Sequence, residues 1–434
     1  MAKTAYTYDI TTSKKDNRAT VCLSVCHLIY AVINMFLSTF LVAHIYSLTT
    51  DIFSYAVNVG IYQISTYAVM LVSYYVLSIL VDKTDRIWCY RIANILNAGI
   101  VIVTIFFGQD LAKLVVVAGV LNGFSHGAYY ASFNVLKQEM VSRKTMDKFT
   151  VVLSVLTKVV NVVFPIVLGA LIEVSTFSVV AIYVLVLAVA QCILTFFVKA
   201  KRPANSNFSL KEYFKDLKEH PKVFKKMKAL YIIGFFYGLT SAVSMLLNIN
   251  IMMQFGSNLS LGVITGCCSL FAVVVILIVS KFTKVGKRPL LFVASAILPC
   301  AGAILFVSLP NMVTLIVYHV CLSFCEVINA TIYDTYRNKN LKEAGMYKDI
   351  AEHQCITESI FQITRIISFG LMIMFGYIGN NIVLQIGFVL FVVGYSITSL
   401  LLMRYESRGV KDEKQEEQAQ AEENIKVNEG EKKE

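Results

Sequence analysis

The segment KAKRPANSNFSLKEYFKDLKEHPKVFKKMK, from Lys199 to Lys228, is the one long polar stretch between apolar runs, and it lies near the middle of the chain. Its ten Lys and Arg residues are typical of a loop on the cytoplasmic side of a membrane. Leu210, Phe214 and Leu217 recur at helical spacing, which predicts a short amphipathic helix over 209–219. Ser209, three residues before a glutamate, has the spacing of a capping box at its start. We interpret the segment as a connector between two membrane-embedded halves.

The composition of the whole chain indicates a membrane protein. The 434 residues are 57% hydrophobic and 15% charged, and the mean hydropathy is +0.66. A soluble domain carries about 25% charged residues. The net charge of +11 comes from short Lys and Arg clusters between apolar runs, so nucleic-acid binding is not indicated. The ten Cys are scattered, which favours reduced thiols over a disulfide framework. No cofactor is expected.

The apolar runs predict an all-α polytopic fold. A spanning helix needs about 20 apolar residues, and the first run lacks a cleavage site, so we expect it to remain as an anchor. Twelve spans are predicted, at about 20–47, 53–81, 88–108, 111–136, 149–172, 176–198, 229–254, 259–280, 289–308, 312–336, 352–376 and 381–404. The expected organisation is a segment 1–18, a six-helix half 19–198, a central loop 199–228, a second half 229–404 and a charged, disordered tail 405–434.

The loop charges predict the orientation of the chain. With the N-terminus inside, the Lys and Arg clusters all fall on the cytoplasmic side, and Lys113 is the exception. Both termini are therefore expected in the cytoplasm. At an offset near 200 residues His126 aligns with Glu326 and Lys158 with Glu358, which favours two parallel six-helix repeats.

A loop motif carries a family resemblance. SILVDKTDRIWCYR, from Ser78 to Arg91, fits the pattern G-x-L-x-D-R-x-G-R-R at Leu80, Asp82, Lys83 and Arg86, with Ser78 in place of a glycine. Its counterpart in the second half, VSKFTKVGKR, keeps Gly286, Lys287 and Arg288.

With these motifs, residues 18–405 resemble the major facilitator superfamily of transporters, in a bacterial type. The resemblance implies two pseudo-symmetric six-helix halves with spans one, four, seven and ten around a cavity. It also implies that Asp82 acts as a gating contact in the outward-open state.

Polar residues inside the predicted spans are the candidate substrate and ion pathway, because charge within a bilayer usually faces a partner or a pathway. Glu358, Gln362 and Arg365 are spaced i, i+4 and i+7, so they share one helical face. Lys158 and Glu326 are expected at a depth similar to that of Glu358, and together they would form a proton or cation site. The structural alternative is that these charges are ion pairs that only hold the helices.

Three further polar residues extend the candidate pathway. His126 is interpreted either as a proton relay or as a hydrogen-bonded packing residue. Asn34 and Asn248 offer amides on spans one and seven, for substrate binding or for contacts between helices. The Tyr and Phe residues are interpreted mainly as interface and packing residues. No metal site is predicted.

The leading functional hypothesis is a secondary transporter that moves a small polar solute by alternating access, coupled to H⁺ or Na⁺. Alternatives are a sugar–cation symporter of the glycoside–pentoside–hexuronide type, a drug or metabolite exporter, a lipid flippase, and a sensor that does not transport. No nucleotide motif and no catalytic constellation is visible, so an enzyme is not expected. We expect a monomer in a cell membrane, the inner membrane of a bacterium.

Overall fold

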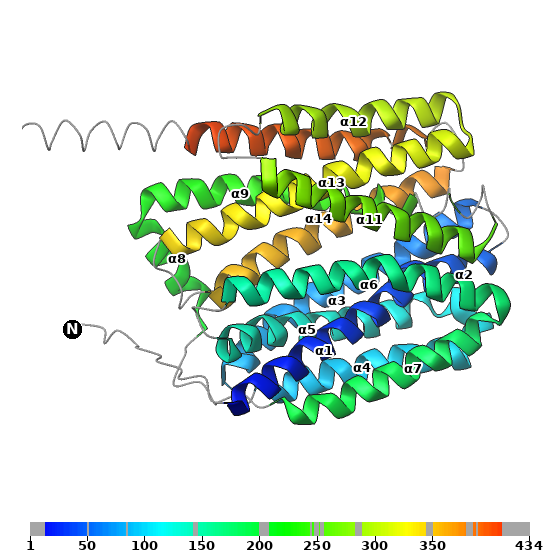
Figure 1. Cartoon of the computed structure of the whole chain (residues 1–434), viewed down its shortest axis with the longest axis horizontal. Coiled ribbons are helices and arrows are strands. Elements are labelled where there is room, and N and C mark those ends of the chain that lie inside the picture. The colour runs from blue at the N-terminus through cyan, green and yellow to red at the C-terminus, as the bar shows by residue number, and fades with distance from the viewer. Residues whose placement is uncertain are drawn as a thin grey trace, which may run out of the picture.

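The computed structural model contains helices and no strands in the residues that it describes. These are residues 14–49, 52–83, 86–141, 146–198, 208–243, 245–246, 251, 256–282, 289–343, 350–378, 385–387 and 389–409. The long helices run along the long axis of the molecule in two groups, blue to teal below and green to red above in Figure 1.

The first group comes from the first half of the chain. It consists of α1 (Lys14–Met35), a π-helical turn (Phe36–Phe40), α2 (Leu41–Ser47), α3 (Ile52–Lys83), α4 (Arg86–Phe106), α5 (Val115–Met140), α6 (Met146–Val174) and α7 (Phe177–Leu194), with 3-10 turns at Gly108–Lys113 and Thr195–Phe197. The second group consists of α9 (Pro221–Leu239), α11 (Asn258–Phe282), α12 (Pro289–Ser308), α13 (Met312–Glu343), α14 (Ile350–Ile378) and a last helical span, Gln385–Gly409.

The helices lie where the apolar runs predict them. Ten of the described helices are long and apolar enough to cross a membrane. Helices α5 and α9 lie at the positions of predicted spans four and seven, but their polar residues lower their hydropathy: Asn122, Ser125 and His126 on α5 and a run of lysines on α9. Helix α9 begins at Pro221, earlier than the predicted span, because proline is favoured at the first position of a helix. The interpretation as twelve spans stays a prediction.

The predicted connector helix is confirmed as α8 (Leu210–Glu219), and the Ser209 half of its predicted capping box is confirmed too. The Ser209 hydroxyl accepts a hydrogen bond from the Glu212 backbone N–H. The predicted apolar face is wrong by one residue: Tyr213 and Leu217 are buried, whereas Phe214 is 39% exposed. Tyr213 turns inward because its hydroxyl finds hydrogen-bonding partners beneath the helix.

Those partners fasten α8 to the beginning of α14. The hydroxyls of Tyr213 and Tyr231 each lie 3.3 Å from Nδ1 of His353, a residue on α14 that is buried. One residue earlier, the Glu352 carboxylate accepts a hydrogen bond of 3.1 Å from the Ser209 backbone N–H. The connector is therefore bonded to the same helix that carries the predicted polar face (Figure 1).

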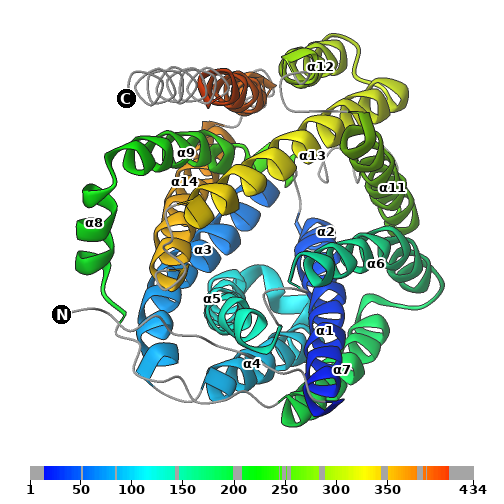
Figure 2. The same cartoon turned by 60° about the vertical axis from the view of Figure 1, so that its left-hand side comes forward.

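The two groups of helices meet along α3 with α14 and along α6 with α11 (Figure 2). The contact between α6 and α11 is close because glycines lie in it. A Cβ added to Gly262 would lie 2.2 Å from the Pro165 carbonyl oxygen, and one added to Gly169 would lie 2.5 Å from the Asn258 carbonyl oxygen. Small residues let helix backbones approach closely, so these glycines set the spacing there.

The apolar core is shared at one end of the molecule and largely divided at the other. Away from α8, one cluster joins both groups, for example Phe36 and Phe177 with Leu261 and Phe306. At the end that carries α8, one cluster around Tyr90 comes from the first group together with Cys355 of α14, and another comes from α8 and the second group. The halves thus share a large core at one end and are packed largely separately at the other.

Candidate functional site

The predicted polar face of α14 is a hydrogen-bonded chain. The Gln362 amide Nε2 donates to Oε2 of Glu358 at 3.0 Å, and a guanidinium nitrogen of Arg365 donates to Oε1 of Gln362 at 3.3 Å. Gln362 is fully buried between them, whereas Glu358 and Arg365 are half-buried. The spacing i, i+4 and i+7 produces this chain because it places the three residues one above another.

Arg365 lies where the two groups of helices meet. Its guanidinium carbon is 5.1 Å from the ring centroid of Tyr67 on α3 and 5.8 Å from that of Phe361 on α14. It also interacts electrostatically with His126 and Tyr130 on α5. A cation over an aromatic face is stabilised by the ring quadrupole, so Arg365 has aromatic partners from both groups.

His126 belongs to an aromatic cluster between α1 and α5. Its Nδ1 is hydrogen-bonded to the Tyr30 hydroxyl, and its ring stacks on Tyr130 with centroids 6.2 Å apart. Tyr30 in turn stacks on Tyr129, centroid to centroid 3.5 Å. His27 extends the cluster through a hydrogen bond of 2.8 Å to the Tyr129 hydroxyl. These contacts agree with the interpretation of His126 as a hydrogen-bonded packing residue. His126 also interacts electrostatically with Arg365, so it lies near the polar chain of α14.

Glu326 and Lys158 form a second polar group. The Tyr395 hydroxyl donates a hydrogen bond of 2.5 Å to Oε1 of Glu326, and Lys158 interacts electrostatically with the same carboxylate. The structure thus associates Lys158 with Glu326, and Glu358 with Gln362 and Arg365. The single three-charge layer expected from the sequence stays a prediction.

A third charged pair lies near the end of α13. Oδ1 of Asp334 is 3.2 Å from a guanidinium nitrogen of Arg337, and both residues interact electrostatically with Glu358. The arginine side chain is 15% exposed. This interior arginine is therefore paired with a carboxylate directly.

The remaining predicted residues are placed as follows. Asn34 is half-buried in α1, next to the π-helical turn. Asp82 and Lys83 end α3 and Arg86 begins α4, but their side chains lie outside the described part of the structure. Asn248 and the motif residues Gly286, Lys287 and Arg288 also lie outside the described residues.

Tyrosines are the site residues that sequence reasoning missed. The interpretation of tyrosines as interface and packing residues did not single out Tyr30, Tyr129 and Tyr395, which are buried and are hydrogen-bonded to, or stacked beside, the polar groups. A usable signal was present for one of them, because Tyr129 follows His126 by three residues, on the same helical face. Among the described residues, no group of three His, Cys, Asp or Glu is arranged to hold a metal ion.

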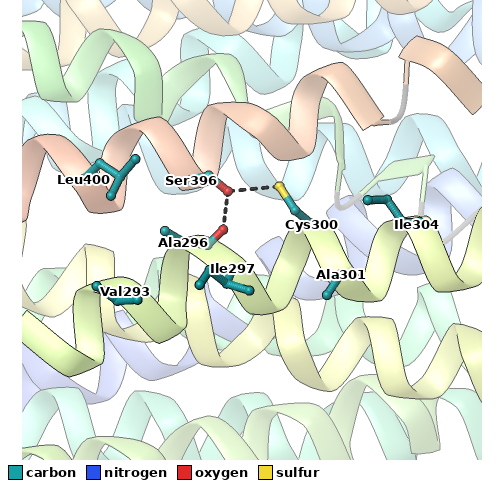
Figure 3. Close-up of a pocket in the computed structure, with 8 residues that line it drawn as sticks. All are labelled: Val293, Ala296, Ile297, Cys300, Ala301, Ile304, Ser396 and Leu400. Atoms are coloured by element: carbon teal, nitrogen blue, oxygen red, sulfur yellow. Dashed lines mark hydrogen bonds between the residues drawn. The ribbon is translucent and has the colours of Figure 1, made fainter.

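A groove on the flank of the molecule is separate from these charges. It lies between α12 and the last helical span and is lined by Val293, Ala296, Ile297, Cys300, Ala301, Ile304, Ser396 and Leu400 (Figure 3). The Ser396 hydroxyl donates to the Ala296 carbonyl and lies 3.0 Å from the Cys300 sulfur. Its lining is apolar apart from these two groups, as expected for a surface that faces lipid.

Comparison with known proteins identifies the family. The family model described as Major Facilitator Superfamily matches residues 20–349. The chain belongs to this superfamily. It is a multi-pass membrane protein, and the fold of this superfamily member is shared by solved transporters.

A crystal structure of a POT family transporter in complex with 5-aminolevulinic acid has a TM-score of 0.65 and 12% identity, over 91% of this chain and 96% of that one. The nucleoside transporter NupG has a TM-score of 0.62 and 12% identity, over 91% and 99%. The human organic anion transporter MFSD10 (TETRAN) has a TM-score of 0.59 and 13% identity, over 89% and 99%. At these identities the likeness concerns the fold.

One sequence relative is "Uncharacterized protein YqgE" of Bacillus subtilis (strain 168), 26% identical over 211 residues. The match covers 48% of this chain and 48% of that relative, so about half of each protein is compared.

Proposed function

We propose that this superfamily member is a secondary transporter that moves a small polar solute across a cell membrane by alternating access, driven by a gradient of H⁺ or Na⁺. The observation that carries the proposal is the chain Glu358–Gln362–Arg365, which lies where the two groups of helices meet. Charged residues within spanning helices are costly, and in transporters they line substrate and ion pathways.

Glu358 is the proposed coupling residue. A carboxylate can take up and release a proton or hold a cation, and this one is half-buried rather than sealed in the core. Its one hydrogen bond among the described residues comes from the neutral Gln362 amide. Glu326 with Lys158, and His126 with its tyrosine partners, are proposed as further members of the ion pathway, with Asn34 and Asn248 as substrate contacts.

The packing of the core supports a specific conformation. If both termini are cytoplasmic, as the loop charges predict, the end that carries α8 faces the cytoplasm. The shared core then closes the outer end, and the largely divided core belongs to the inner end. We propose that this is an inward-facing state, and that Asp82 and Arg86 in the motif loop contribute to the opposite state. In this proposal the protein is a monomer in a bacterial plasma membrane.

The test is gradient-driven transport by the purified protein in proteoliposomes. A panel of polar solutes, sugars included, is applied under an imposed pH or sodium gradient, and uptake or current is recorded. We expect accumulation in the wild type and its loss in Glu358→Gln, with Glu212→Gln as the matched control because Glu212 is exposed on α8. Near-normal coupled uptake by Glu358→Gln refutes the role of this residue. Gradient-independent lipid movement in place of solute uptake favours a flippase.

A further inference from the structure

Resting on the transport function proposed above, we propose that the guanidinium of Arg365 binds the anionic group of the solute, so that the substrates are small organic carboxylates.

The first argument is the unused hydrogen-bonding capacity of Arg365. A guanidinium carries five N–H donors. Among the described residues Arg365 makes one hydrogen bond, the 3.3 Å bond to the neutral Gln362 amide oxygen. No described carboxylate lies within the 4.0 Å of an ion pair. A positive charge within a spanning helix needs an anion, and Glu358, with which Arg365 interacts electrostatically, is not in contact with it.

The second argument is the contrast with Arg337. This arginine, also within a long helix, has Asp334 at 3.2 Å three residues before it on α13. Arg365 has no acid at the corresponding position, where Gln362 stands, and Glu358 lies a further turn away. The chain therefore neutralises one interior arginine directly and holds the other at a distance from its nearest carboxylate.

The third argument is the surroundings of the guanidinium. Its carbon lies over the ring of Tyr67 at 5.1 Å and over the ring of Phe361 at 5.8 Å. These rings stabilise the positive charge without accepting conventional hydrogen bonds from its N–H groups. The planar fork of N–H donors matches the two oxygens of a carboxylate, which arginine binds through paired hydrogen bonds. Tyr67 and Phe361 come from α3 and α14, so such a ligand would contact both halves.

This placement links solute binding to the coupling residue. A carboxylate on Arg365 competes with Oε1 of Gln362 for the guanidinium, and the Nε2 of the same amide donates to Glu358. Reorientation of one side chain, Gln362, then alters the hydrogen bonding of Glu358 when the solute binds.

The experiment compares carboxylates with their neutral amides on the full-length protein in detergent. Benzoate, lactate and succinate are titrated against benzamide, lactamide and succinamide, with the melting temperature as readout, because a ligand that binds the folded state raises it. We expect at least one carboxylate to stabilise the wild type while its amide does not. In Arg365→Gln the affinity should fall by more than about tenfold, the scale of a charge-assisted hydrogen bond.

Two further variants separate binding from folding. Arg365→Lys keeps the charge without the planar fork and should bind with intermediate affinity. Arg404→Gln removes an exposed arginine on the last helical span and should bind as the wild type does. The proposal is overturned if no carboxylate stabilises the wild type, if the amide binds equally well, or if Arg365→Gln retains the affinity.

Uptake of the stabilising carboxylate into proteoliposomes distinguishes this proposal from the transport function. Binding that depends on Arg365 without uptake refutes transport and leaves the anion site standing. Coupled uptake of a neutral solute that is unaffected in Arg365→Gln refutes the anion site and leaves transport standing.

Discussion

Replacing Gly262 with alanine tests whether the contact between α6 and α11 holds the two halves together. The new Cβ would lie 2.2 Å from the Pro165 carbonyl oxygen and 3.4 Å from the Cα of Gly169. Ordinary van der Waals contact begins at 3.4 Å, so the helices must separate by about 1.2 Å at this point. The nearest atoms belong to the backbone of α6, which cannot move aside by rotating a side chain. Such overpacking costs about 1–3 kcal/mol of folding free energy.

The matched control is Gly99→Ala on α4, because a Cβ there meets nothing within 4 Å. Alanine is a better helix former than glycine by about 0.5–1 kcal/mol, so Gly99→Ala is expected to stabilise the protein. Thermal denaturation followed with a thiol-reactive dye measures both variants, since Cys26, Cys325 and Cys355 are buried free thiols that become exposed on unfolding. We expect Gly262→Ala to melt below the wild type and Gly99→Ala at or above it.

The same substitution has a functional consequence under alternating access. The clash raises the free energy of the state in which α6 and α11 are in close contact. A penalty of about 1.4 kcal/mol would shift the equilibrium tenfold towards the state in which these two helices are apart. Thiol labelling at positions near the outer ends of these helices should then increase. If Gly262→Ala melts like Gly99→Ala and labels like the wild type, the close contact does not control the spacing of the halves.

Two further substitutions test individual hydrogen bonds. Tyr395→Phe removes the donor to Glu326 and should lower the unfolding free energy by about 1–3 kcal/mol in a thermal melt. Tyr55→Phe should leave the unfolding free energy unchanged, because the buried Tyr55 hydroxyl has no hydrogen-bond partner in the described structure. Equal losses of unfolding free energy in Tyr395→Phe and Tyr55→Phe would contradict the argument. Glu352→Ala removes the carboxylate that accepts the hydrogen bond from the Ser209 N–H. In inside-out vesicles, trypsin should therefore cleave within α8 faster in this variant than in the control Glu219→Ala, which changes an exposed residue. Equal cleavage rates in the two variants would refute the docking of α8 on α14.

Much of the fold was predictable because its signals are local. Apolar runs long enough to span a bilayer place the long helices, and Ser209 places the beginning of α8. The hydrogen-bonded chain on α14 was also predictable, since residues 358, 362 and 365 follow helical periodicity. In each case the physics acts within one helix.

What the sequence could not supply are contacts between helices. Nothing local indicates that Lys158 interacts with Glu326, or that the guanidinium of Arg365 lies over the ring of Tyr67 in the other half of the molecule. The inward turn of Tyr213 on α8 likewise depends on His353, a residue far along the chain. Pairings of this kind are fixed by tertiary packing, and one sequence carries little information about them.

The hydrogen bonds between α8 and α14 mean that the position of α8 would follow movements of α14. Because Ser209 and Tyr213 are hydrogen-bonded to Glu352 and His353, any rotation of α14 displaces α8 with it. A fluorophore on the exposed Lys215 would therefore report movement of the helix that carries Glu358. If α8 lies in the cytoplasm, as the loop charges predict, a soluble protein bound to α8 would also restrain α14 and with it the proposed transport cycle.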